Sequence, residues 1–116
     1  MSATFSVAAE RVSEDTGVVT VVGELDIYTA PQLKECLLGL LDEGVTRLVV
    51  DLTAVTFIDS TALGVLIGGV RRVNDVDGAM ALVASSRPVA RVLTITGLDR
   101  VFAIRDTREA ALASLN

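Results

Sequence analysis

Short apolar runs alternate along this chain with segments whose apolar residues recur at helical spacing, and this alternation constrains the fold most. The clearest run is Arg47 to Leu52, which is apolar enough for a strand buried on both faces. A helical pattern of leucines precedes it, at Leu33, Leu37, Leu40 and Leu41. Strands separated by helices pair in parallel through right-handed crossovers. We therefore expect an α/β fold with a mostly parallel sheet.

The expected element order is β-β-α-β-α-β-α-β-α over a single domain, residues 1–116. Strands are predicted at 4–12, 18–25, 47–52, 79–84 and 101–104. Helices are predicted between a capping box at 29–32 and a stop at Gly44, and at 61–73, 88–95 and 107–115. A turn at 14–17 joins the first two strands into a hairpin. The prediction is a mixed, mostly parallel sheet that starts with an antiparallel hairpin and carries helices packed on it.

Charge and cysteine content narrow the partners and the compartment. The net charge is −5, with 15 acidic and 10 basic residues, and Arg71–Arg72 is the one adjacent basic pair. Nucleic acid and anionic membranes need a positive footprint, so we expect neither as a partner. The single cysteine, Cys36, lies in an apolar helical stripe and reads as a core residue. Without a disulfide, a signal-peptide pattern or an apolar run near the ~20 residues of a membrane span, a cytoplasmic protein is expected.

Two acidic loops follow predicted strands, where functional groups gather in such sheets. One is residues 23–29, which contains Asp26, and the other is Asp59-Ser60-Thr61. If the two strands are parallel neighbours, Asp26 and Asp59 lie at the same end of the sheet, near Ser60. The hydroxyl of Ser60 then lies at a helix N-terminus, where free N–H groups and the helix dipole favour an anion.

Catalysis has little support in these residues. The chain has no histidine, one lysine (Lys34) and one cysteine, so serine-protease chemistry and transition-metal sites lack their components. Asp26 and Asp59 alone are weak evidence for Mg²⁺. A receiver-type phospho-aspartate domain would need an acidic pair after the first strand and a lysine near the last. We expect no enzyme activity, no catalytic residue, no metal and no cofactor.

Ser60 therefore reads as a helix cap or as a residue that is modified. Asp59 is an alternative N-cap, which would leave Ser60 and Thr61 free in the first helical turn. A phosphate on Ser60 would add about −1.5 to −2 charges. The helix N-terminus tolerates that charge and Asp59 repels it. Further along the helix, Gly64, Gly68 and Gly69 each weaken it by roughly 1 kcal/mol relative to Ala, and we expect close approach to the sheet as the compensation.

Residues 57–66, Phe-Ile-Asp-Ser-Thr-Ala-Leu-Gly-Val-Leu, resemble the phosphorylation motif of the STAS-domain anti-sigma factor antagonists of bacteria. Three further blocks resemble that family in the same order: Gly23-Glu24-Leu25-Asp26 with Thr29-Ala30, then 48–52, and then 96–98 with 101–102. The resemblance implies that the unphosphorylated protein binds an anti-sigma factor serine kinase and releases its sigma factor. It further implies that the kinase phosphorylates Ser60, that the complex then dissociates, and that a serine phosphatase reverses the modification.

The same resemblance implies the contact residues: Asp26, Ile27, Tyr28, Thr29, Asp59, Ser60, Thr61 and Ala62. Thr61 is a less favoured second acceptor. The family usually has Gly where this chain has Ala62, and the extra methyl could hinder approach of the kinase. The alternatives are an unphosphorylated scaffold, a ligand sensor or a subunit of a transport assembly. The aliphatic composition fits a monomer or a weak dimer.

Overall fold

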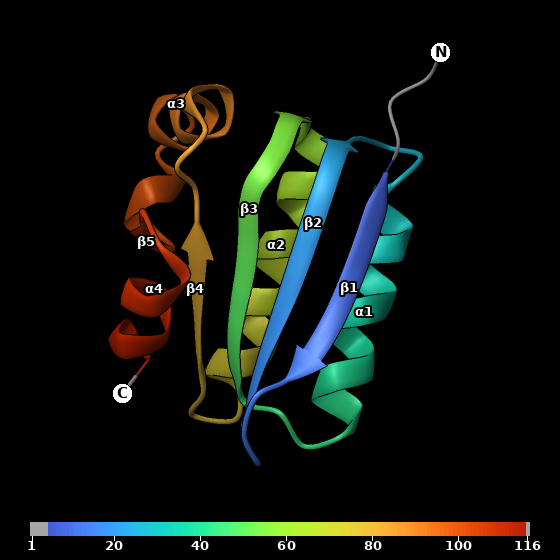
Figure 1. The fold of residues 1–116 in the computed structure, drawn as a ribbon, viewed down its shortest axis with the longest axis vertical. Coiled ribbons are helices and arrows are strands. Elements are labelled where there is room, and N and C mark those ends of the chain that lie inside the picture. Colours follow the sequence, from blue (N-terminus) through green and yellow to red (C-terminus); the bar gives the residue numbers. More distant parts are fainter. Residues whose placement is uncertain (1–4, 116) are drawn as a thin grey trace.

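A computed structural model describes residues 5–115 as five strands and four α-helices, with one 3₁₀ helix, in one sheet with the order β1-β2-β3-β4-β5 (Figure 1). The strands are β1 Ser6–Arg11, β2 Thr16–Leu25, β3 Arg47–Ile58, β4 Ala79–Val83 and β5 Ala103–Arg105. The helices are α1 Ala30–Asp42, α2 Ser60–Asn74, α3 Arg87–Ile95, η1 Leu98–Arg100 and α4 Arg108–Ser114. β1 pairs antiparallel with β2, and all other pairs are parallel. The expected mixed sheet is confirmed.

The longest strand extends further than its apolar pattern indicates. We predicted that it ends at Leu52, but β3 continues to Ile58. Its second half pairs with β2 alone, because β4 accompanies β3 only as far as the Asp51–Val83 pair. Two register irregularities between β2 and β3 interrupt the alternation of inward and outward side chains there. The apolar signature of a two-sided buried strand is therefore lost in residues 53–58.

The termini of the other strands differ by a few residues. Thr4, where the first strand was predicted to start, lies outside the described residues, and β1 ends at Arg11. β5 begins at Ala103 instead of residue 101, because η1 occupies the preceding segment and Phe102 is buried ahead of the strand. No helix within residues 5–115 combines the length and the apolar character needed to cross a lipid bilayer.

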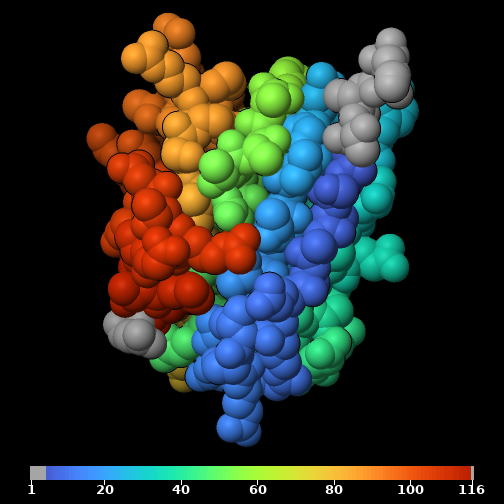
Figure 2. Space-filling view, in the orientation of Figure 1, coloured from blue at the N-terminus to red at the C-terminus, as the bar shows by residue number. Residues whose placement is uncertain are grey.

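Helices on opposite faces of the sheet give two cores. In Figure 1, α1 and α2 lie behind β1, β2 and β3, and α4 lies beside β4 and β5. The larger core unites α1, α2 and α3 with the sheet through side chains such as Leu33, Leu66 and Leu93. The smaller core joins α4 to the other face through Ala111 and Leu115. Figure 2 shows that the β1–β3 part of this second face is left at the surface.

One polar cluster ties α4 to the open part of the sheet. The guanidinium of Arg108 donates to Thr20 Oγ1 at 2.9 Å and to Asp51 Oδ2 at 3.2 Å. Burial raises the pKa of the Asp51 carboxyl, but hydrogen bonds from Thr53 and the bond and charge of Arg108 outweigh it, so this pKa lies below its ordinary value. The cluster favours the ionised carboxylate and anchors the last helix.

The glycines of α2 do not share one explanation. A Cβ on Gly69 would lie 3.3 Å from Met80 Sδ and 3.5 Å from Leu37 Cδ1, so this glycine lets the helix approach β4 and α1 closely. A Cβ on Gly64 or Gly68 would meet no atom within 4 Å. The expectation that close packing against the sheet explains all three is therefore wrong for these two. Neither is required by the packing of this domain.

Candidate functional site

The two acidic loops are brought together at one end of the sheet. Leu25 and Ile58 are register partners at the ends of β2 and β3, so each strand delivers its loop to the same edge. The backbone N–H of Asp59 donates to the carbonyl of Leu25 at 3.1 Å. The expected placement of Asp26 and Asp59 at one end is therefore confirmed. The site is this end of the sheet, formed by residues 24–29 and 57–61.

Asp59 is the N-cap of α2, which decides between the two capping alternatives. Its backbone is extended (φ −111°, ψ −179°), and its Oδ1 accepts a hydrogen bond from the Ala62 N–H at 3.0 Å. Ser60 is the first helical residue and takes no part in this cap, and both Ser60 and Thr61 are exposed. Modification of the Ser60 hydroxyl would thus leave the cap in place.

Two electrostatic effects act in opposite directions on an anion at Ser60. The first N–H groups of a 15-residue helix and its dipole favour an anion beside Ser60. The Asp59 carboxylate, next in sequence, disfavours one. The helix N-terminus would let the fold tolerate a phosphate on Ser60. The added negative charge beside Asp59 would at the same time change the charge of the surrounding surface strongly.

The loop before α1 is held by its own side chains. Asp26 Oδ1 accepts hydrogen bonds from the N–H groups of Tyr28 (2.9 Å) and Thr29 (3.1 Å). Thr29 Oγ1 accepts from the Asp26 N–H at 2.9 Å and donates to the Glu24 carbonyl at 2.8 Å. Because this hydroxyl is occupied within the loop, it makes no capping hydrogen bond to α1. The predicted capping box at 29–32 is therefore wrong, and Asp26 and Thr29 instead fix the loop conformation.

The rigid loop presents apolar side chains to solvent. Ile27 is 60% exposed and Tyr28 is 84% exposed. Phe57, which pairs with Glu24 across β2 and β3, is 48% exposed at the same end. Phe57 was missed as a site residue, because the sequence pattern ended its strand at Leu52. An aromatic residue two positions before the helix-capping aspartate was the available signal.

Ala62 cannot contribute its side chain to this surface. It is 0% exposed and belongs to the larger core, while its N–H is bonded to Asp59. Its methyl group is therefore packed inside the protein and does not face solvent. The structure removes Ala62 from the expected contact residues, and with it the expectation that this methyl hinders the partner.

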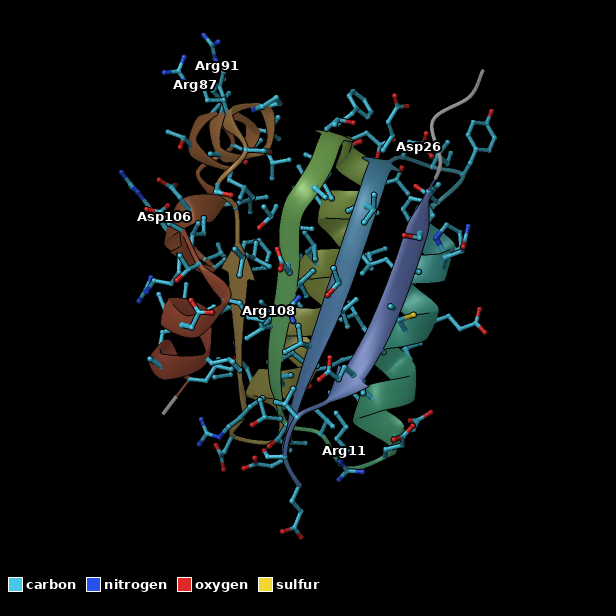
Figure 3. The ribbon with its side chains drawn as sticks, in the orientation of Figure 1. Arg11, Asp26, Arg87, Arg91, Asp106 and Arg108 are labelled. Atoms are coloured by element: carbon cyan, nitrogen blue, oxygen red, sulfur yellow. The ribbon has the colours of Figure 1, made fainter. Side chains whose placement is uncertain are left out.

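Opposite charges flank the same end of the molecule. Glu24, Asp26 and Asp59 supply the acidic part, around the β2 and β3 exits. Arg87 and Arg91 project from α3 on the other side of that end (Figure 3). Within residues 5–115, no three His, Cys, Asp or Glu side chains gather in the way that metal ligands do. Exposed apolar side chains and charged groups of both signs are thus present together at this end of the molecule.

Comparison with known proteins places this geometry in a family. The model of the STAS domain matches residues 8–111. The anti-sigma-B factor antagonist of Staphylococcus epidermidis is 34% identical over 96 residues, which cover 83% of this chain and 89% of that protein.

Solved structures agree with this match. The crystal structure of an anti-sigma factor antagonist from Mycobacterium paratuberculosis superposes with a TM-score of 0.88 at 30% identity, covering 99% of this chain and 98% of that one. The anti-sigma factor antagonist SpoIIAA in its unphosphorylated form gives 0.80 at 26% identity, covering 92% and 93%. The matched residues include both loops of the site and the whole of α2. The chain belongs to the STAS domain family.

Proposed function

We propose that this protein is an anti-sigma factor antagonist whose binding is switched off by phosphorylation of Ser60. The observation that carries the proposal is the capping of α2 by Asp59, which leaves the Ser60 hydroxyl exposed at a helix N-terminus. Relatives that match most of the chain are anti-sigma factor antagonists, and one of them is described in an unphosphorylated form. The protein acts in this proposal by binding and not by catalysis.

In the unphosphorylated state the partner, an anti-sigma factor that is also a serine kinase, contacts the end of the sheet. Ile27, Tyr28 and Phe57 provide exposed apolar area, and exposed aromatic residues are frequent anchors of interfaces. Asp26 and Thr29 hold the loop in one conformation, which lowers the entropy lost on binding. Bound in this way, the partner releases its sigma factor.

Phosphorylation then acts by charge. The kinase transfers the γ-phosphoryl of its own ATP to Ser60 Oγ, the hydroxyl proton is lost, and ADP leaves. The phosphoserine adds about −1.5 to −2 charges beside Asp59. An effective switch needs at least a hundredfold change in affinity, about 2.7 kcal/mol. A phosphatase that hydrolyses the phosphoserine restores the binding form.

Mass spectrometry tests the proposal directly. The protein is incubated with Mg-ATP and, one at a time, with each purified anti-sigma factor serine kinase of the source organism. We expect one phosphate on Ser60, no phosphate on Ser60→Ala, and unchanged phosphorylation of Thr61→Ala. Modification of Thr61 instead of Ser60 would reassign the acceptor. Tight binding without any phosphate would identify an unregulated antagonist. If no kinase binds the protein and none phosphorylates it, the proposal is overturned.

A further inference from the structure

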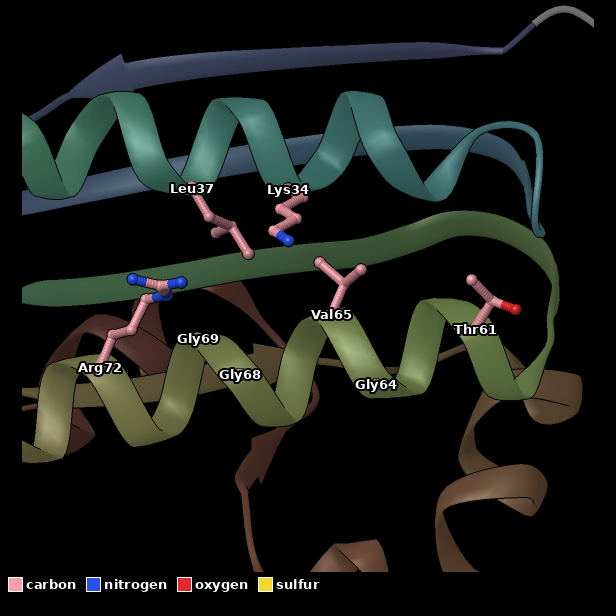
Figure 4. Close-up of a pocket in the computed structure, with 8 residues that line it drawn as sticks. All are labelled: Lys34, Leu37, Thr61, Gly64, Val65, Gly68, Gly69 and Arg72. Carbon is pink, nitrogen blue, oxygen red and sulfur yellow. The ribbon is translucent and has the colours of Figure 1, made fainter.

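A groove between α1 and α2 leads away from the phosphorylation site. Its volume is about 260 Å³, and it is open to solvent (Figure 4). Residues that line it from the two helices include Lys34, Leu37, Thr61, Gly64, Gly68 and Arg72. Thr61 follows Ser60 directly, so the groove is continuous with the surface proposed to bind the kinase.

Two cations converge on this groove in a chain with a net charge of −5. Lys34, the sole lysine, extends from α1, and Arg72 extends from α2, with Leu37 between their charged ends (Figure 4). The ion pairs found within residues 5–115 join Arg11 to Glu43, Arg47 to Asp15 and Arg108 to Asp51. Lys34 and Arg72 are therefore free to pair with carboxylates from another molecule.

The floor of the groove is lowered by two glycines that the domain itself does not require. Gly64 and Gly68 have room for a side chain, and glycine is a poor helix former, so folding favours another residue at both positions. Gly69, which is packed against Met80 and Leu37, shows what a packing requirement looks like in the same helix. Without side chains at 64 and 68, the backbone of a second helix has room to approach α2.

We propose that the groove is a second docking site for the kinase and receives an amphipathic helix of that partner. The helix presents carboxylates to Lys34 and Arg72 and places small or apolar side chains over Gly64 and Gly68. This inference rests on the proposed function and extends its contact surface beyond the phosphorylated end. It assigns the α1–α2 groove to the same partner.

The dimensions favour a helix over a small ligand. Ligand pockets usually enclose about 300–1,000 Å³, and this open groove falls below that range. The lining of α2 runs from Thr61 to Arg72, roughly 16 Å at the helical rise, which is about three turns. A partner helix of three turns can therefore contact the full length of the groove.

A contact outside the phosphorylated element also has a kinetic signature. It would hold the substrate on the kinase while the Ser60 hydroxyl enters the kinase active site. Loss of the groove should therefore raise the KM for phosphorylation at least tenfold and leave kcat within twofold, because the acceptor and its helix cap are untouched.

The test fills the groove and removes its charge separately. Gly68→Leu blocks the floor, and Gly39→Leu makes the same change at an exposed, open glycine of α1 that does not line the groove. Lys34→Glu combined with Arg72→Glu reverses the two cations. Its control is Arg100→Glu combined with Arg105→Glu, which alters the net charge equally at two exposed arginines near β5.

Affinity for the phosphorylating kinase is measured by titration calorimetry after circular dichroism has shown that each variant is folded. We expect the Kd to rise at least thirtyfold for both groove variants and at most threefold for both controls. A benzophenone amino acid at position 68 should crosslink to one kinase helix with acidic residues toward both ends of its apolar face. The same crosslinker at position 39 should give no such product.

Several outcomes would overturn the groove assignment while leaving the proposed function intact. These are groove variants that bind the kinase as tightly as their controls, a crosslink from position 68 to a second copy of this chain, and a crosslink to a kinase segment without carboxylates. Binding of inorganic phosphate that is lost in Lys34→Glu, with kinase affinity unchanged, would assign the groove to a small anion instead. If no kinase binds or phosphorylates the wild-type chain, both proposals fail together.

Discussion

The backbone N–H of Asp59 donates to the carbonyl of Leu25 at 3.1 Å, which joins the end of β3 to the end of β2. Through this bond, the residue that caps α2 is fixed relative to the loop that begins at Asp26. The segment that carries Ser60, the proposed phosphoacceptor, and the apolar loop therefore lie together at one end of the sheet. A partner that binds the loop at Asp26 therefore approaches the same end of the sheet as Ser60.

Substitution of the cap and of the neighbouring serine should affect stability differently. Asp59→Ala removes the hydrogen bond to the Ala62 N–H and should lower the free energy of unfolding by about 1 kcal/mol. Ser60→Ala removes an exposed hydroxyl outside the cap and should change it by less than about 0.5 kcal/mol. Urea unfolding monitored by circular dichroism measures both. Equal losses would show that Ser60 contributes to the cap.

The Thr29 hydroxyl should be essential for the shape of the binding loop. Thr29→Val removes the bonds to the Asp26 N–H and the Glu24 carbonyl, with an expected cost of about 1–2 kcal/mol. Kinase affinity should fall as well, because the loop loses its fixed conformation. Thr29→Ser keeps the hydroxyl and should restore both stability and affinity. Chemical unfolding and calorimetric titration are the measurements, and normal affinity in Thr29→Val would contradict a role for loop rigidity.

The exposed aromatic residues should matter for binding and not for folding. Tyr28→Ala and Phe57→Ala should each weaken kinase binding at least tenfold, because each substitution removes an exposed aromatic side chain that a partner can contact. Their melting temperatures should stay close to that of the wild type. Val101→Ala, at a 51% exposed position outside the site, is the control. Unchanged affinity in both aromatic variants would exclude this end as the contact surface.

The glycines of α2 should respond to alanine with opposite signs. Gly64→Ala and Gly68→Ala should each raise the free energy of unfolding by up to about 1 kcal/mol, because the methyl group meets open space and alanine favours the helix. Gly69→Ala should lower it, because the methyl group would press on Met80 and Leu37. Thermal and urea unfolding of the three variants decides the matter. A loss at Gly64 or Gly68 would show a packing role that the structure does not contain.

The Asp51–Arg108 pair should make the free energy of unfolding depend on pH in the acidic range. The pKa of Asp51 is lowered on folding, so its contribution is complete above the ordinary value of 3.8 and is lost as pH falls through the folded value. Arg108→Met should cost roughly 1 kcal/mol or less at pH 7, because the Arg108 side chain is 38% exposed. The difference from wild type should shrink below pH 3.8. Urea unfolding from pH 7 to pH 2.5 measures it, and a difference that stays constant would contradict the ion pair.

The local sequence pattern was sufficient to predict a helix or strand where that element buries one clearly apolar face. The leucines of α1 predicted that helix to within a few residues, and the apolar run that begins at Arg47 predicted where β3 starts. The last helix was predicted to start at Thr107, and the Thr107 hydroxyl is its N-cap, accepting a hydrogen bond from the Ala110 N–H at 3.1 Å. Local pattern failed for residues 53–58, because pairing with only one neighbouring strand removes the need for apolar side chains on both faces.

Side-chain competition decided the details of the site. Thr29 and Asp59 both precede helices and both suit a cap, yet only Asp59 caps its helix, because Asp26 and Glu24 engage the Thr29 hydroxyl. Ala62 lies two positions after Ser60, the proposed phosphoacceptor, and is still completely buried. Neither result follows from residue type and spacing alone, since both depend on which backbone groups the adjacent loop brings within hydrogen-bonding distance.

The sequence by itself determined the α/β class, the order of the elements and the presence of an acidic, hydroxyl-bearing segment after a strand. These features depend on local periodicity and on motif residues that are adjacent in the chain. The tertiary structure decided which side chains face solvent at that segment and what surrounds them. The parallel pairing of β2 with β3 brought Asp26, Phe57 and Ser60 to one end. The packing of α1 beside α2 created the groove between Lys34 and Arg72. Such surfaces arise from contacts between residues distant in sequence, and no local pattern encodes them.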